Sequence, residues 1–310
     1  MPQLQAEDVT KAYDGKVAVD RVSFEVNAGE VFGLLGPNGA GKSTFIRMAM
    51  DILRPDSGRI LVSGKPSTEA DHDRVGYLPE ERGLYRKQKV IDVLDYFARL
   101  KGMKGPDVKK KAKAALEAVG LGEWAGKRVD ALSKGMQQKV QLVGTLLHEP
   151  DVVVLDEPFS GLDPLNARMV KETIQGLKRN GRVVVLSTHQ MDQVEELCDR
   201  IVMIDNGRRV LYGTVREIKK TYGPEIHRAN GRGNVVVVDG EGDFAAIEGV
   251  LSSQGSGGET RLTLDPALTP ERFLQAALAA GCSIARFEAA PTPLEEIFVH
   301  VATTNRAAVA

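Results

Sequence analysis

The first 35 residues alternate apolar and polar side chains, as in Val22-Ser23-Phe24-Glu25-Val26. Turn-forming sequences interrupt this pattern at Asp14-Gly15 and at Asn27-Ala28-Gly29. Alternation with a period of two is typical of antiparallel strands that bury one face and expose the other. The next segment, residues 31–35, is apolar throughout and predicts a strand buried on both faces.

The rest of the first 220 residues mixes short apolar runs with helical periodicity. A helix is predicted over residues 42–53, and between residues 91 and 147 the apolar positions keep a helical period, with Val93, Leu94, Phe97 and Leu100 on one face. Short runs that predict strands lie at residues 59–62, 75–78, 152–156, 183–187 and 201–204. We therefore expect an α/β fold, with an antiparallel β subdomain, a mostly parallel sheet and a helical subdomain inserted at about residues 80–150.

The composition changes near residue 220. All lysines lie at or before Lys220, and residues 221–310 carry 6 arginines against 11 acidic side chains, a net charge of −5. The junction Thr221-Tyr222-Gly223-Pro224 is rich in turn formers. We therefore predict two domains, 1–220 and 221–310. The second is expected to be a small α+β domain with the order β-α-β-α-β-α, its elements lying at residues 235–238, 244–251, 261–264, 273–280, 284–287 and 294–301.

Charge and hydropathy exclude several classes of protein. The 310 residues carry 41 basic and 42 acidic side chains, a net charge of −1, so we expect no nucleic-acid partner. No apolar run approaches the roughly 20 residues that span a bilayer. The amino terminus also lacks the basic start and apolar core of a secretory signal. We therefore expect a cytoplasmic protein. Cys198 and Cys282, in apolar surroundings, are expected to be buried free thiols.

A glycine-rich string follows the apolar run at residues 31–35. It reads Gly36-Pro37-Asn38-Gly39-Ala40-Gly41-Lys42-Ser43-Thr44. Between a strand and a helix, such a string matches the P-loop, whose backbone N–H groups surround phosphate oxygens at the positive end of the helix. Lys42 is then placed to reach the β- and γ-phosphates of ATP, and the Ser43 hydroxyl to bind Mg²⁺. The alternative is a plain glycine-rich turn.

Two further apolar strands are predicted to end in polar side chains at the same sheet edge. Asp156 and Glu157 follow the run at 152–155, and His189 follows the run at 183–187. Asp156 is suited to hold Mg²⁺, and Glu157 to orient or deprotonate an attacking water. A capping or solvent-facing acidic pair is the alternative for the carboxylates, and a structural role is the alternative for His189.

A third string, Leu132-Ser133-Lys134-Gly135-Met136, lies upstream of the acidic pair. On its own it reads as a helix that begins after the N-cap Ser133. Together with the P-loop and Asp156-Glu157, it resembles the signature of the ATP-binding cassette (ABC) ATPases over about residues 4–220. Lys134 stands where that family commonly has glycine, and Met136 where it has glutamine, whereas Ser133 and Gly135 are kept.

The resemblance implies further roles. Tyr13 matches the aromatic residue that stacks on adenine, His189 the switch histidine at the γ-phosphate, and Ser160-Gly161-Leu162-Asp163-Pro164 the loop at the dimer seam. Glu80, after Val75-Gly76-Tyr77-Leu78-Pro79, stands where the family usually has a glutamine that senses Mg²⁺. A glutamate there can still bind Mg²⁺. The stretch from Tyr77 to Tyr85, together with that from Leu132 to Lys139, is most similar to the ATPase subunits of type-2 bacterial exporters, among them sodium- and drug-efflux systems.

The family implies an ATP- and Mg²⁺-dependent ATPase subunit of an exporter. Two copies would pair head-to-tail, with Ser133 and Gly135 of one copy facing ATP on the P-loop of the other, and a separate membrane permease would hold the chain on the inner face of the membrane. Soluble ABC ATPases of DNA repair or translation are the alternative. They are disfavoured because only 88 residues separate Thr44 and Ser133 (132 − 44), with no long heptad run, and because the chain has one cassette. A nucleotide kinase is a weaker alternative.

Overall fold

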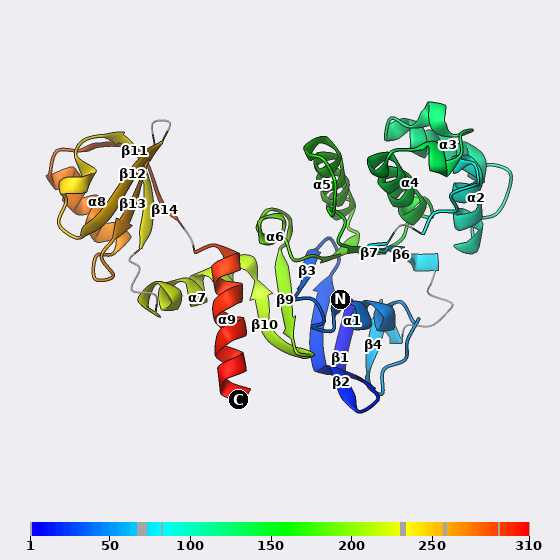
Figure 1. Cartoon of the computed structure of the whole chain (residues 1–310), viewed down its shortest axis with the longest axis horizontal. Helices are drawn as coiled ribbons and strands as arrows, with labels where there is room; N and C mark the ends of the chain where they lie inside the picture. The colour runs from blue at the N-terminus through cyan, green and yellow to red at the C-terminus, as the bar shows by residue number, and fades with distance from the viewer. Residues whose placement is uncertain are drawn as a thin grey trace. The chain divides into compact units, whose positions relative to one another are not determined.

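The chain folds into two compact units, Met1–Tyr212 and Gly213–Ala310. This computed structural model describes residues 2–66, 73–81, 83–229, 234–256, 259–290 and 292–309 (Figure 1). The boundary between the two units lies at residues 212–213, before the predicted position at residue 220. The turn formers at 221–224 do not form a linker, because they lie inside helix α7 (Val215–Ala229). The backbone N–H of Glu217 donates to Thr214 Oγ1, and the N–H of Thr214 donates to Glu217 Oε2. This reciprocal capping box begins the helix at Val215.

The first unit contains two sheets. The antiparallel sheet has the order β2-β1-β4-β5, and the second sheet has the order β10-β9-β3-β8-β7-β6. The strands of the first are β1 (Pro2–Tyr13), β2 (Lys16–Asn27), β4 (Ser57–Val62) and β5 (Lys65–Pro66). Those of the second are β3 (Val31–Leu35), β6 (Val75–Leu78), β7 (Val152–Asp156), β8 (Val183–Ser187), β9 (Arg200–Asp205) and β10 (Arg208–Thr214).

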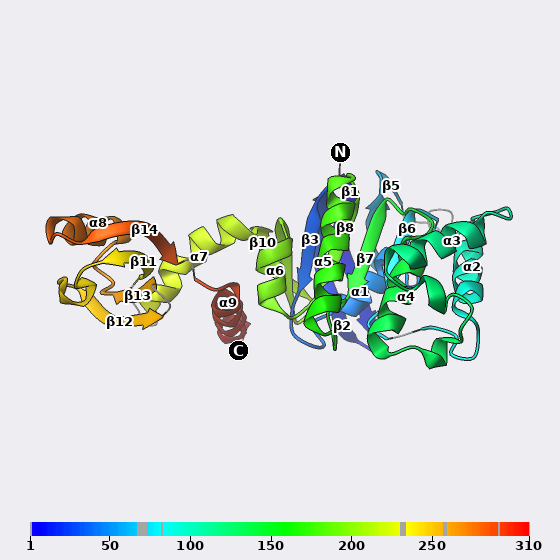
Figure 2. The same ribbon diagram turned by 90° about the horizontal axis from the view of Figure 1, so that it is seen from above.

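Strands β9, β3, β8, β7 and β6 run parallel in this order. Figure 2 shows β3, β8, β7 and β6 side by side. All residues of β3, β7 and β8 are buried, as their uninterrupted apolar runs predicted. One hydrophobic core joins the two sheets to α1, and within it Phe24 lies 5.0 Å from Phe32 and 4.9 Å from Phe45 between ring centroids. The buried parallel strands give the P-loop and the acidic pair a rigid support.

Among the described residues of the first unit there are also six α-helices. They are α1 (Lys42–Ala49), α2 (Val90–Leu100), α3 (Val108–Ala118), α4 (Lys134–Leu146), α5 (Pro164–Arg179) and α6 (Met191–Leu197). Helices α2, α3 and α4 form a subdomain with its own core. Helix α1 ends at Ala49, before the predicted residue 53, and Asp51 beyond it adopts a left-handed φ of 52°. Leu100, which shares a helical face with the buried Val93 and Leu94, is the last residue of α2 and is 63% exposed.

The C-terminal unit is an antiparallel sheet with the order β12-β13-β11-β14 and a core of its own. Its elements after α7 are β11 (Val235–Glu241), β12 (Val250–Ser256), β13 (Glu259–Leu264), α8 (Pro270–Ala279), β14 (Ser283–Ala290) and α9 (Leu294–Val309). The predicted helix over 244–251 is wrong. A 3-10 turn, Phe244–Ala246, is followed by Gly249, which has a φ of 89°, and then by β12. The strand was not predicted because most residues of β12 are polar and do not alternate with apolar ones.

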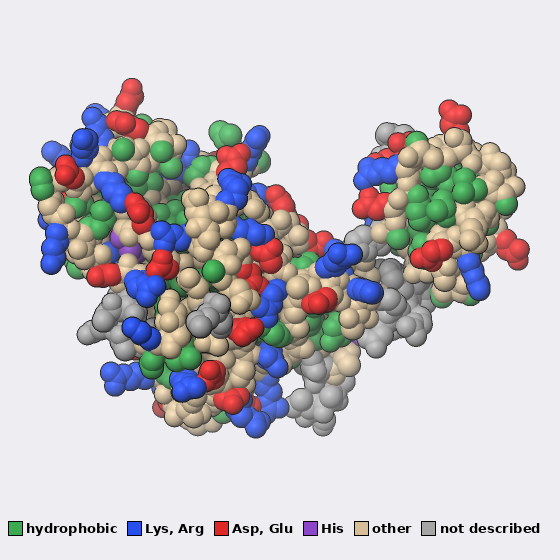
Figure 3. All heavy atoms as spheres, turned by 180° about the vertical axis from the view of Figure 1, so that it is seen from behind, with side chains coloured by type: hydrophobic (Ala, Val, Ile, Leu, Met, Phe, Trp, Pro, Cys, Tyr) green, Lys and Arg blue, Asp and Glu red, His purple; other side chains and the backbone are tan. Residues whose placement is uncertain are grey.

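Hydrophobic side chains gather on the face of the C-terminal unit that Figure 3 shows. Among the residues of this unit, Leu251 is 57% exposed and Leu278 is 56% exposed. Among the residues that the structure describes, no helix has both the length and the apolar character needed to cross a bilayer.

The separate cores predict that the two units can be destabilised independently. Phe273 is fully buried in the C-terminal core and stacks on Phe287, with 6.2 Å between the ring centroids. Phe273→Ala should therefore cost this unit about 3–5 kcal/mol. Hydrogen exchange should accelerate in β11, β13 and β14, while β3, β7 and β8 keep their protection. Leu278→Ala on the exposed side of the same helix is the matched control. Equal loss of protection in both units would contradict separate cores.

Candidate nucleotide-binding site

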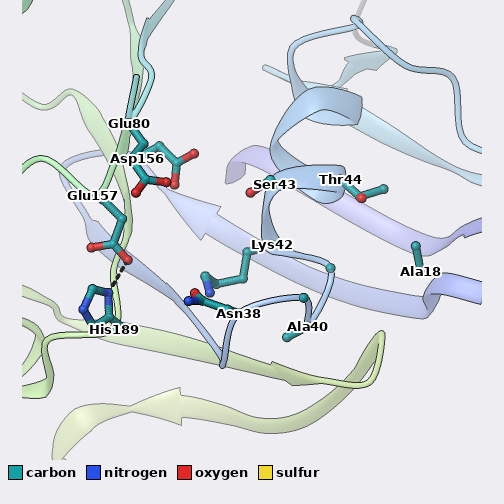
Figure 4. Close-up of a pocket in the computed structure, with 12 residues that line it drawn as sticks. Ala18, Asn38, Ala40, Lys42, Ser43, Thr44, Glu80, Asp156, Glu157 and His189 are labelled. Carbon is teal, nitrogen blue, oxygen red and sulfur yellow. Dashed lines mark hydrogen bonds and ion pairs between the residues drawn. The ribbon is translucent and has the colours of Figure 1, made fainter. Parts of the chain in front are cut away.

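A pocket of about 230 Å³ opens at the carboxyl ends of β3 and β7 (Figure 4). Residues 38–44, from the glycine-rich loop and the start of α1, form one side of it. The other lining residues are Ala18, Glu80, Asp156, Glu157 and His189. The structure thus brings together the P-loop, the acidic pair, Glu80 and His189, which are separated by up to 150 residues in the sequence. Ala18 was missed, because an alanine in a strand carries no chemical signal.

Two glycines allow the loop to curl closely against its neighbours. Gly36 has a φ of 150°, and a Cβ there would lie 2.2 Å from the carbonyl oxygen of Ile204. Gly41 has a φ of 108°, and its Cβ would lie 2.3 Å from the carbonyl oxygen of Ala18. No larger residue fits either position without displacing backbone. Gly41 is also the N-cap of α1 and supplies no side-chain acceptor, so the first N–H groups of the helix point into the pocket uncapped.

Lys42 is the buried cation of the pocket. Its Nζ donates hydrogen bonds to the carbonyl oxygens of Gly36 at 2.6 Å and Pro37 at 3.1 Å, and these bonds tie the start of the loop to the start of α1. Burial lowers the pKa of Lys42, whereas the charges of Glu157, Asp156 and Glu80 act in the opposite direction. An ammonium group in this position meets the phosphate-binding requirement of a P-loop.

Asp156 ends β7 and is buried. Burial raises the pKa of its carboxyl group, the neighbouring charges of Glu80 and Glu157 raise it further, and Lys42 lowers it. In Figure 4 the carboxylates of Glu80 and Asp156 lie together, facing the side of the pocket that carries Ser43. The ionised form of Asp156 is therefore less favourable here than in water, and a further cation beside it would favour that form.

Glu157 is held in a fixed orientation. Its Oε1 lies 2.7 Å from Nδ1 of His189, and its Oε2 accepts a hydrogen bond from Thr188 Oγ1 at 3.1 Å. Its backbone N–H donates to Ser187 O at 2.8 Å, and its φ is 47°. A left-handed conformation at a residue other than glycine costs on the order of 1–3 kcal/mol. Thr188 was missed, although its position between Ser187 and His189 at the end of an apolar run signalled a polar sheet edge.

The charges of the pocket fit a divalent cation shared with phosphate. Among the residues that the structure describes, no group of three or more His, Cys, Asp and Glu side chains could hold a metal alone. A metal here would find oxygen donors in the Asp156 carboxylate, the Ser43 hydroxyl and a bound phosphate, and Mg²⁺ prefers such donors. Three carboxylates, those of Glu80, Asp156 and Glu157, face the single ammonium group of Lys42. This excess of negative charge favours a cation between them.

Ser133 and Gly135 do not line this pocket. Ser133 is the exposed N-cap of α4, and its hydroxyl accepts a 3.3 Å hydrogen bond from the N–H of Met136. A Cβ at Gly135 would lie 2.6 Å from Nδ2 of Asn166, so α4 begins against the start of α5. Asp163 caps α5 by accepting from the N–H groups of Leu165 and Asn166. The start of α4, with Ser133 and Gly135, therefore lies against the start of α5, with Asp163 and Asn166.

Tyr13 also lies outside the pocket lining. It ends β1, its side chain is 43% exposed, and Lys11 Nζ lies 5.9 Å from its ring centroid. The ring is therefore accessible at the surface, whereas Ala18 of the next strand lines the pocket itself.

Comparisons with known proteins identify the family of the chain. The ABC transporter family model matches residues 19–160, and the model of the C-terminal domain of DrrA1-3-like ATP-binding proteins matches residues 213–302. An uncharacterized ABC transporter ATP-binding protein of Methanocaldococcus jannaschii is 44% identical, over 70% of this chain and 79% of that protein. The Nod factor export ATP-binding protein I of Ralstonia nicotianae is 37% identical, over 70% of this chain and 68% of that protein.

The likeness extends to solved structures. An ATP-binding subunit of an ABC transporter superposes with a TM-score of 0.67 at 32% identity, covering 71% of this chain and 93% of that one. The expected α/β fold with a C-terminal domain is thus confirmed. The chain belongs to the ABC transporter family as an ATP-binding subunit, an ATPase coupled to transport.

Proposed function

We propose that this chain is the ATPase subunit of an exporter, that two copies close on ATP and Mg²⁺, and that a separate permease holds the pair at the inner face of the membrane. The observation that carries the proposal is the joining of the P-loop, Asp156 and the Glu157–His189 pair in one pocket. The similarity to a Nod factor export protein supports export. The soluble alternatives are disfavoured because the matched family is that of the transporters.

The phosphates of ATP are held by residues 38–44. The N–H groups of the loop and of the first turn of α1 donate to phosphate oxygens, and Lys42 exchanges its bonds to Gly36 and Pro37 for bonds to the β- and γ-phosphates. Ser43 and Asp156 hold Mg²⁺, with Glu80 next to Asp156 as a third candidate ligand. When bound, Mg²⁺ neutralises charge on the phosphates and orients them for attack.

Glu157 acts as the general base. Its carboxylate orients the attacking water and accepts its proton. Thr188 and His189 fix both carboxylate oxygens, so the base is held in place before the nucleotide binds. His189, whose side chain is 63% exposed, has its second ring nitrogen available for the γ-phosphate.

The second copy completes the site. Ser133 is exposed and Gly135 is partly exposed, and both lie outside the pocket of their own chain. The start of α4, where Ser133 is the exposed N-cap and Gly135 carries no side chain, suits a phosphate oxygen. We therefore place Ser133 and Gly135 against the nucleotide held by residues 38–44 of the partner copy. The exposed ring of Tyr13 stacks on the adenine.

Blocking the base should trap the closed pair. Glu157→Gln keeps the size and the hydrogen bond to Thr188 but cannot accept a proton, so turnover should fall by on the order of 10² or more. Nucleotide binding should persist because Lys42 and the loop are unchanged. Since ATP bound between two copies shifts the population towards the pair, size-exclusion chromatography should show a long-lived dimer with ATP.

A second substitution tests the arrangement of the copies. Ser133→Arg in the Glu157→Gln protein should abolish the ATP-dependent dimer while the monomer still binds ATP. Ser252→Arg, on β12 of the C-terminal unit, is the matched control and should leave the dimer intact. A double variant that still dimerises with ATP would show that α4 does not meet the nucleotide across the pair.

We expect Asp156 to lower the stability of the nucleotide-free protein and to contribute to the binding of Mg²⁺ with ATP. Because burial raises its pKa, its carboxyl group stabilises the nucleotide-free fold only at low pH, and this contribution is lost as the pH rises through the raised pKa. Asp156→Asn should therefore raise the melting temperature of the nucleotide-free protein at neutral pH. It should also remove most of the stabilisation that Mg²⁺ with ATP gives the natural protein, about 2.7 kcal/mol at a ligand concentration of 100 Kd. Thermal denaturation over a pH series measures both effects. A lower melting temperature without nucleotide would contradict this account.

A further inference from the structure

Glu80 is a third carboxylate in a pocket that already contains the base and the metal-binding aspartate. It follows β6 by two residues and lines the pocket with Asp156 and Glu157 (Figure 4). Its charge reaches both sides of the site, since it raises the pKa of Asp156 and opposes the lowering of the Lys42 pKa. Glu80 therefore acts on the same small volume that receives the phosphates.

The backbone around Glu80 is fixed from the neighbouring helix. Gln141, a buried residue of α4, donates from Nε2 to the carbonyl oxygens of Pro79 at 3.4 Å and Glu81 at 3.3 Å. These two bonds flank Glu80 on either side. The side chain of Glu80 lines the pocket and is exposed.

A glutamate at this position has two properties, a ligand oxygen and a negative charge, and only the charge is absent from glutamine. As a metal ligand it offers an oxygen, which a glutamine amide would offer as well. As a charge it repels phosphate oxygens whenever no metal lies between them, which an amide would not do. Two unit charges about 4 Å apart interact by roughly 1 kcal/mol in water and 4 kcal/mol at an effective dielectric constant of 20.

We propose that Glu80 makes nucleotide binding conditional on a divalent cation, because its charge rejects metal-free ATP and accepts ATP only with its metal. This inference rests on the proposed function, since it concerns the same pocket. It assigns Glu80 a role in selecting the metal-bound form of the nucleotide. With the cation in place, the carboxylate faces positive charge and the repulsion is offset.

The test compares Glu80→Gln with the natural protein by calorimetric titration of the non-hydrolysable analogue AMP-PNP, once in EDTA and once with Mg²⁺. In EDTA the variant should bind on the order of tenfold more tightly. With Mg²⁺ the two proteins should differ much less, because the amide oxygen can still serve as a ligand. In EDTA the difference should also shrink as salt is added, since an exposed charge is screened.

Glu81→Gln is the matched control. Glu81 is the next residue, is exposed and does not line the pocket, and its contact with Gln141 is through the backbone. It should leave binding unchanged in both conditions. Equal affinities of Glu80→Gln and the natural protein in EDTA would overturn the proposal, as would an equal gain for Glu81→Gln. If the natural protein fails to bind AMP-PNP even with Mg²⁺, the proposed function itself is wrong.

Discussion

The site depends on one constraint: parallel strands of a sheet end at the same edge. Because β3, β7 and β8 are parallel neighbours, the residues that follow them must meet there, although they come from distant parts of the chain. This edge brings Lys42, Asp156, Glu157 and His189 into one pocket. Full burial of the three strands supplies the rigidity, and the loop glycines supply the close approach.

The cost of this arrangement is electrostatic. Burial lowers the pKa of Lys42 and raises that of Asp156, so both side chains are less stable in their charged forms here than in water. Glu157 adds a left-handed backbone. Such features are tolerated where a ligand makes use of them. A phosphate chain with its metal would offset the unpaired charges, and the site is thereby prepared for a ligand of that composition.

Most residues that the sequence singled out for the site line one pocket of the structure, because the strongest sequence signals are local. A nine-residue loop between an apolar strand and a helix, and an acidic pair after another apolar strand, each have few structural explanations. The features that the sequence did not predict depend on tertiary contacts. Ala18 lines the pocket only because β2 lies beside the loop, and Leu100 is exposed only because α2 ends there. β12 lacks alternating apolar residues, and the Thr214–Glu217 capping box outweighs the turn formers at 221–224.

We propose that one pocket of this chain and the start of α4 of a second copy enclose the same nucleotide. A structure of the Glu157→Gln protein with ATP and Mg²⁺ tests it most directly. The account predicts that the γ-phosphate contacts Lys42 and His189 of one copy and Ser133 of its partner, with the metal between Ser43 and Asp156. A nucleotide bound at residues 38–44 with Ser133 of every copy remote from it would contradict the account.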